Sequence, residues 1–130
     1  MKQKKTTENY LKTVYMLSKK GDVHSIQIAK SLGVSRPTVS VSLKALESEG
    51  YLYLDETKVV HLTEKGKDIA ENIYERHKTL KDLLISLGVS ETTAAKDACE
   101  MEHTVSAESF FALKKILKKQ ADDINGVHLL

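Results

Sequence analysis

The chain has 130 residues, of which 41% are hydrophobic and 29% charged, a composition typical of a globular protein and not of a disordered one. Its single cysteine excludes an intramolecular disulfide and fits a reducing cytoplasm. No apolar run approaches the roughly 20 residues that span a bilayer, and no apolar segment follows the basic N-terminus, so neither a membrane protein nor a secreted protein is expected.

Helical spacing of apolar residues predicts three helices in the first half of the chain. They run from Thr7 to Lys20, from Ser25 to Leu32, and from an N-cap at Ser35 to about Glu49. Pro37 falls in the first turn of the third helix, where the missing N–H costs no hydrogen bond. Gly33 allows a tight turn between the second and third helices.

Two short β-prone runs, 51–54 and 59–62, flank a polar turn and predict a β-hairpin. A long helix then extends from Thr63 to Leu87, and a fifth helix extends from Ser90 to about His103 or Val105. A sixth helix begins at Ser106. We therefore expect a mainly α protein with one small β-hairpin.

The order of helix, glycine-containing turn, helix and hairpin is that of a winged helix-turn-helix, in which the second helix places its first turns in the DNA major groove. The alternative, a helix pair that only packs, does not explain the hairpin that follows directly. Residues 1–62 carry ten Lys and Arg against six Asp and Glu, which fits a DNA-binding domain over residues 1–63. The candidate DNA-binding residues are Ser35, Arg36, Pro37, Thr38, Ser40 and Lys44.

Residues 64–130 then form a second domain, in which polar residues interrupt the apolar pattern. Cys99, Glu102 and His103 stand at i, i+3 and i+4, so a helix places them on one face, and His77 interrupts the apolar stripe of the long helix. A thiolate, a carboxylate and an imidazole on one face suit a transition metal. The alternatives are an ordinary buried cysteine, a hydrogen-bonded core histidine and a solvated Glu102–His103 pair.

These features resemble the diphtheria-toxin-repressor (DtxR/MntR) family of metal-dependent transcription regulators, from about Thr7 to Leu117. The matching stretches are TTENYLKTVYML, IAKSLGVSRPTVSVSLKALESEGYL, LTEKGK, YERHK and ACEMEHTVS. The resemblance implies a cytoplasmic homodimer with a winged helix and a helical dimerisation and metal-binding domain, in the two-domain form without an SH3-like domain. It further implies that Fe²⁺ or Mn²⁺ is the co-repressor on palindromic operator DNA of metal-uptake genes, with no membrane and no small organic substrate as partner.

The resemblance also implies particular metal ligands, namely Asn9, Cys99, Glu102 and His103. Cys99 matches the variant of iron-responsive members, which favours Fe²⁺ over Mn²⁺. His77 matches a ligand of the family's second site, but Lys81 and Ala95 stand where that site needs a carboxylate and a histidine. We therefore expect one functional metal site per protomer, with His77 either joining it or serving as a core residue. A second site rebuilt with other ligands, such as Asp97 or Glu100, is the alternative.

Dimer contacts are expected on the last three helices, with Phe110, Phe111 and Leu113 as candidates. The main alternative function is a winged-helix repressor that senses a small molecule or a thiol redox state through Cys99 without metal. An enzyme is not expected, because no glycine-rich loop near Cys99 offers an oxyanion hole and a metalloenzyme would leave the helix-turn-helix unexplained. A protein-binding scaffold would show no affinity for DNA.

Overall fold

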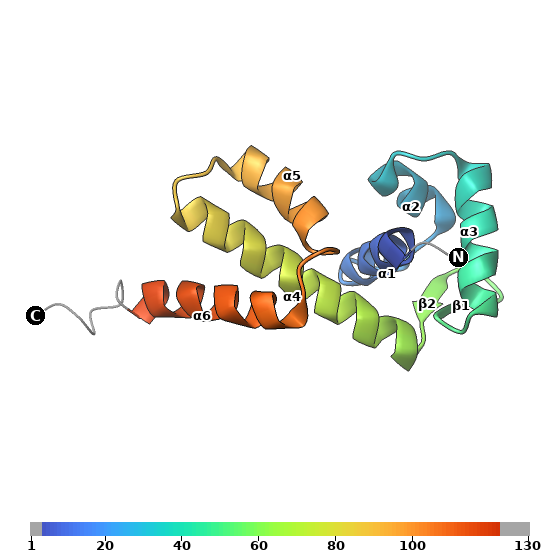
Figure 1. The fold of residues 1–130 in the computed structure, drawn as a ribbon. Helices are drawn as coiled ribbons and strands as arrows, with labels where there is room; N and C mark the ends of the chain where they lie inside the picture. The colour runs from blue at the N-terminus through green and yellow to red at the C-terminus, as the bar shows by residue number, and fades with distance from the viewer. Residues whose placement is uncertain (1–3, 123–130) are drawn as a thin grey trace, which may run out of the picture. The chain divides into compact units, whose positions relative to one another are not determined.

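The computed structural model describes residues 4–122, with side chains for residues 4–120 (Figure 1). Within this part of the chain, helices dominate and two short strands pair as an antiparallel hairpin, which confirms the expected fold class. The elements are α1 Lys4–Ser18, α2 Ser25–Leu32, α3 Arg36–Ser48, β1 Leu52–Leu54, β2 Val60–Leu62, α4 Glu64–Ser86, α5 Glu91–Met101 and α6 Ala107–Asp122.

The chain forms two compact units, Met1–Ile73 and Tyr74–Leu130. The boundary between them falls inside α4. None of the helices in the described part of the chain is both long and apolar enough to cross a membrane.

The ends of α2 and α3 are set by residues that the sequence identifies. Ser35 caps α3 by accepting a hydrogen bond from the Thr38 backbone N–H at 3.2 Å, and Pro37 lies in its first turn. Gly33 ends α2 with a φ of 68°, in the left-handed region that glycine adopts without strain. α1 begins at Lys4 and not at the predicted Thr7, because the preceding lysines are good helix formers and extend the helix by a turn.

The core of the first unit lies between α1, α2, α3 and the hairpin. Leu11 and Val14 of α1 pack with Ile28 of α2 and Leu46 of α3, all fully buried. The hairpin pairs Leu52 with Leu62 and Leu54 with Val60, so it contributes its buried leucine and valine to the same core. Burial of these apolar side chains stabilises the arrangement of the three helices and the hairpin, and it leaves the outer side of α3 and the hairpin turn at the surface.

Thr63 connects the hairpin to α4 and confirms the predicted start of the long helix. Its hydroxyl donates to the Gly50 carbonyl at 2.7 Å and accepts from the Gly66 N–H at 3.2 Å, while its N–H donates to the Tyr51 carbonyl at 3.1 Å. The side chain therefore caps α4 and ties its first turn to the segment before β1.

In the second unit, α5 and α6 lie beside the C-terminal half of α4 (Figure 1). Ala94 and Ala98 of α5 are fully buried. α4 ends at Ser86, one residue before the predicted end at Leu87, which is 63% exposed. Leu80 and Leu83 are the buried leucines near the end of the helix.

Candidate metal centre and DNA-binding face

The six candidate DNA-binding residues all lie on the exposed side of α3 and its cap. Val39 and Leu43 point into the core of the first unit, whereas Val41 is 70% exposed and offers an apolar contact for a thymine methyl group. The Ser35 and Thr38 hydroxyls lie 2.7 Å apart at the N-terminus of the helix. The exposed candidates are Ser35, Arg36, Pro37, Thr38, Ser40 and Lys44.

A groove of about 470 Å³ lies between α3, the start of α2 and the hairpin turn. Lys44 of α3 and Lys58 of the turn both line it, and an ammonium group at such a groove can bind a phosphate of the DNA backbone. The full lining is Ser25, Ser40, Leu43, Lys44, Glu47, Leu54, Asp55 and Lys58. The groove therefore connects the candidate DNA-binding residues of α3 with the turn between β1 and β2.

Asp55 holds the wing turn together from its position directly after β1. One carboxylate oxygen accepts from the Thr57 N–H and hydroxyl, both at 2.8 Å, and from the Val59 N–H at 3.1 Å. The other lies 2.8 Å from His61 Nε2. Lys58, with a φ of 68°, occupies the left-handed region inside this turn. Asp55, whose negative charge would repel a DNA phosphate, therefore has a structural role in the turn between β1 and β2, which forms the tip of the wing.

These contacts make the stability of the wing depend on pH. The hydrogen bonds from His61 and then from the Thr57 hydroxyl hold the pKa of Asp55 far below its ordinary value of 3.8. Because the pKa is depressed in the folded state, the contribution of the carboxylate is complete above the unfolded-state pKa and is lost as the pH falls through that value toward the folded-state pKa.

We therefore expect Asp55→Asn to lower the free energy of unfolding at neutral pH, because the amide cannot replace an acceptor-only carboxylate in four contacts. The difference in the free energy of unfolding between wild type and Asp55→Asn should become smaller as the pH falls from about 5 to about 3. Urea unfolding at a series of pH values measures this difference. Glu56→Gln, at an exposed position of the same turn, is the control. A difference between wild type and Asp55→Asn that does not change with pH would contradict the stabilising role of the Asp55 carboxylate.

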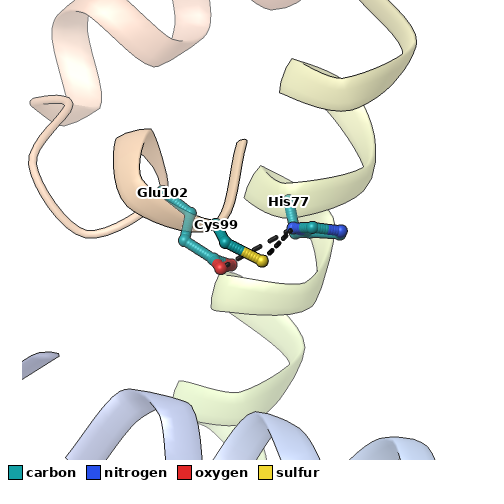
Figure 2. A group of neighbouring side chains, drawn as sticks. All are labelled: His77, Cys99 and Glu102. Atoms are coloured by element: carbon teal, nitrogen blue, oxygen red, sulfur yellow. Dashed lines mark hydrogen bonds and ion pairs between the residues drawn. The ribbon is translucent and has the colours of Figure 1, made fainter. Parts of the chain in front are cut away.

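The second unit brings together three of the predicted metal-ligating side chains, as Figure 2 shows. His77 projects from α4 and Cys99 from the last turn of α5, and Glu102 is the residue that caps the C-terminus of α5. His77 Nδ1 lies 3.8 Å from Cys99 Sγ and 3.6 Å from Glu102 Oε1, and the three ligand atoms all lie within 4.8 Å of one another. Glu102 is fully buried, whereas Cys99 is exposed.

This geometry fits a single metal ion. Two ligand atoms that each lie about 2.0–2.3 Å from one ion are separated by about 3–4 Å, which matches the distances from His77 Nδ1 to Cys99 Sγ and to Glu102 Oε1, and the remaining pair lies within 4.8 Å. A thiolate, an imidazole nitrogen and a carboxylate oxygen together form a donor set for a divalent transition metal. A cation at this point would also offset the cost of burying the negative charge of Glu102.

His103 lies next to this group but outside it. α5 ends at Met101, before the predicted end, and Glu102 keeps helical dihedral angles (φ −58°, ψ −25°) that place it near Cys99. The His103 Nε2 atom lies 3.8 Å from Glu102 Oε1, so the imidazole faces the carboxylate. Asn9, predicted as a further ligand, lies half-buried on α1 in the first unit.

Sequence reasoning missed two charged residues that the structure buries or places beside the site. Glu8 is buried on α1, and its signal in the sequence is its spacing of four residues from Lys12, which is also buried. Arg76 precedes His77 and donates to the backbone that follows α5. Its sequence signal is its position within YERHK, beside a candidate ligand.

Two family models match the chain. Residues 3–60 match "Iron dependent repressor, N-terminal DNA binding domain", and residues 63–126 match "Iron dependent repressor, metal binding and dimerisation domain". The first match covers α1 to the hairpin, and the second covers the helices that carry His77, Cys99 and Glu102. The two models together therefore include the candidate DNA-binding residues of α3 and the candidate metal ligands His77, Cys99 and Glu102.

Individual relatives agree with this match. An uncharacterized HTH-type transcriptional regulator of Methanocaldococcus jannaschii is 33% identical over 120 residues, covering 90% of this chain and 96% of the relative. The transcriptional regulator MntR of Salmonella typhimurium is 40% identical over 92 residues, covering 71% of this chain and 59% of the relative. The solved structure of the manganese regulator SloR has a TM-score of 0.77 at 32% identity and covers 86% of this chain. The match spans only 53% of SloR.

Proposed function

Because the chain belongs to the iron-dependent repressor family, we propose that it is a transcriptional repressor activated by a divalent metal ion bound in its second unit. The membership confirms the resemblance to the diphtheria-toxin-repressor family, and it identifies a family of transcriptional regulators and not of enzymes. The observation that carries the proposal is the group of His77, Cys99 and Glu102, whose ligand atoms lie within 4.8 Å of one another.

We assign one metal ion to each chain and favour Fe²⁺ over Mn²⁺. The thiolate of Cys99 is a softer ligand than the oxygen donors that Mn²⁺ prefers, which supports Fe²⁺. Among the described residues, His77, Cys99 and Glu102 form the group of three side chains that could together hold a metal ion. Lys81, one turn further along α4, lies 3.8 Å from Glu91, and its ammonium group disfavours a second cation nearby.

Each residue at the site has a proposed role in holding the ion. Cys99 and His77 supply sulfur and nitrogen donors from two helices, and Glu102 supplies a buried carboxylate. His103 remains a proposed ligand, supported by the 3.8 Å separation between its Nε2 atom and Glu102 Oε1. Asn9 is proposed as a ligand from α1 on the resemblance alone. A bound divalent cation would supply the positive charge that neutralises the thiolate and carboxylate.

We further propose that the protein binds a palindromic operator as a homodimer and thereby controls metal-uptake genes. Two-fold symmetry of a dimer places two recognition helices about 34 Å apart, one turn of DNA. Phe111 is 59% exposed and Leu113 is half-buried, so both can contribute to a dimer contact. Phe110 is 4% exposed and packs under the Arg76 guanidinium, so its main contacts lie within the protomer.

Metal-dependent DNA binding tests this function. The probe is a duplex selected from a randomised library in the presence of Mn²⁺, and the measurement is fluorescence anisotropy of the full chain with Fe²⁺, with Mn²⁺ and with chelator. We expect either ion to raise DNA affinity about tenfold or more, because a ligand shifts a conformational equilibrium by its differential affinity for the two states. Equal affinity with and without metal would instead support the alternative, a winged-helix repressor that senses a small molecule or a thiol redox state through Cys99 without metal.

Arg36→Ala tests the DNA-binding face separately from the metal site. The guanidinium stands exposed at the start of α3, where it can reach a phosphate or a guanine edge. We expect the substitution to cost about 1–3 kcal/mol of DNA binding in the same anisotropy assay, with metal affinity unchanged. Lys30→Ala, an exposed cation on α2, is the control. Unchanged DNA affinity in Arg36→Ala would remove α3 from the recognition face.

A further inference from the structure

We propose that Arg76 is the positioning residue of the metal centre, because it fixes the backbone that carries Glu102. This inference rests on the proposed function and concerns a residue that binds no metal itself. Arg76 belongs to α4, and its Nη1 atom donates to the Glu102 carbonyl at 3.4 Å and, closer still, to the Val105 carbonyl. Its guanidinium carbon lies 5.2 Å from the centre of the Phe110 ring on α6.

The need for such a contact follows from where Glu102 lies. α5 ends at Met101, whose carbonyl accepts from the Thr104 and Val105 N–H groups, whereas the carbonyls of Glu102 and Val105 lie beyond the last helical turn and accept from Arg76. The helix dipole also places partial negative charge at this end, which favours a cation. Arg76 meets both requirements, and its planar guanidinium can donate to carbonyls while stacking on an aromatic ring.

Three consecutive residues of α4 then hold three different segments of the second unit. Glu75 pairs with Lys114 of α6 at 3.1 Å, Arg76 holds the segment after α5, and His77 faces Cys99 and Glu102. Because Arg76 and His77 are adjacent, the helix that supplies one ligand also determines where the Glu102 backbone lies. The carboxylate is thus held near the imidazole before an ion arrives, which lowers the ordering cost of binding.

The sign of the effect separates positioning from simple electrostatics. Arg76 is a cation near a cation site, so removing its charge would raise metal affinity if charge repulsion were its main influence. Positioning predicts the opposite. Outer partners of metal ligands typically contribute 10–100-fold to affinity, and we expect a loss of about this size when the donor is removed.

The experiment compares Arg76→Met with Arg76→Lys in the full chain, using Co²⁺ as the probe and its thiolate-to-metal absorption as the readout. Methionine keeps an unbranched stem over Phe110 but has no donor, whereas lysine keeps a donor and the charge. We expect about 10–100-fold weaker Co²⁺ binding in Arg76→Met and most of the wild-type affinity in Arg76→Lys. Hydrogen exchange of the amides of residues 103–105 in the metal-free chain should accelerate in Arg76→Met alone.

Lys114→Met is the matched control, because it removes a cation from the same unit at a surface pair with Glu75 that does not involve residues 102–105. Its Co²⁺ affinity should equal that of the wild type. Wild-type or tighter binding by Arg76→Met would overturn the positioning role and leave the proposed function intact. Failure of the wild type itself to bind Co²⁺ would overturn both.

Discussion

Replacing Cys99 with serine is expected to lower the affinity for Fe²⁺ by more than about 100-fold, because even outer partners of metal ligands contribute 10–100-fold. Serine has nearly the same size, but its hydroxyl is a poor substitute for a thiolate with a soft transition metal. Cys99 is exposed, so the free energy of unfolding without metal should change by no more than about 0.5 kcal/mol. Anaerobic calorimetric titration and urea unfolding measure the two effects.

Thr92→Ala provides the control for this loss, since Thr92 is exposed on α5 and lies outside the group of three ligands. The combination of lost metal affinity and retained metal-free stability is specific to a ligand. Wild-type affinity in Cys99→Ser would contradict the assignment of the thiolate to the site. A large loss of metal-free stability would show that Cys99 serves mainly in packing.

Gly66→Ala is expected to lower the free energy of unfolding by about 3 kcal/mol, the upper end of the usual cost of overpacking. A Cβ atom at Gly66 would lie 2.0 Å from the Tyr51 carbonyl oxygen and 3.0 Å from its carbon. Both are backbone atoms, and the same carbonyl accepts a hydrogen bond from the Thr63 N–H, so neither can move without disturbing the start of α4. Urea unfolding of the full chain measures the change.

The matched control is Asp68→Ala, two residues further along α4 at an exposed position. Alanine has a higher helix propensity than aspartate, so this variant should stay within about 0.5 kcal/mol of the wild type. If Gly66→Ala were as stable as Asp68→Ala, then the close approach of α4 to the segment before β1 would not contribute to stability in the way that the structure indicates.

The winged helix could be predicted from the sequence because its boundaries depend on local chemistry. Ser35 as a cap, Pro37 in the first turn and Gly33 with a positive φ each have a local reason to be where they are. The apolar spacing of α3 likewise predicts which residues are buried and which remain for DNA. The wing was only partly predictable, because the internal contacts of Asp55 depend on how the turn closes.

The metal centre shows the limit of such reasoning. Cys99 and Glu102 come close because they lie one helical turn apart, a distance that the sequence specifies. His103 has equally good helical spacing, but α5 ends before it. The place of His77 depends on how α4 packs against α5, and spacing along one helix cannot predict that packing. Arg76 was missed for the same reason, since its partners are backbone carbonyls that carry no sequence signature.

The most direct test of the metal centre is the number of ions that the wild-type chain binds. Anaerobic equilibrium dialysis against Fe²⁺, followed by metal analysis, measures it, with Mn²⁺ in parallel. We predict one tightly bound Fe²⁺ per chain and weaker binding of Mn²⁺, because His77, Cys99 and Glu102 form one site that contains a thiolate. Two ions per chain would show a second site despite Lys81, and no bound ion would contradict metal sensing by this protein.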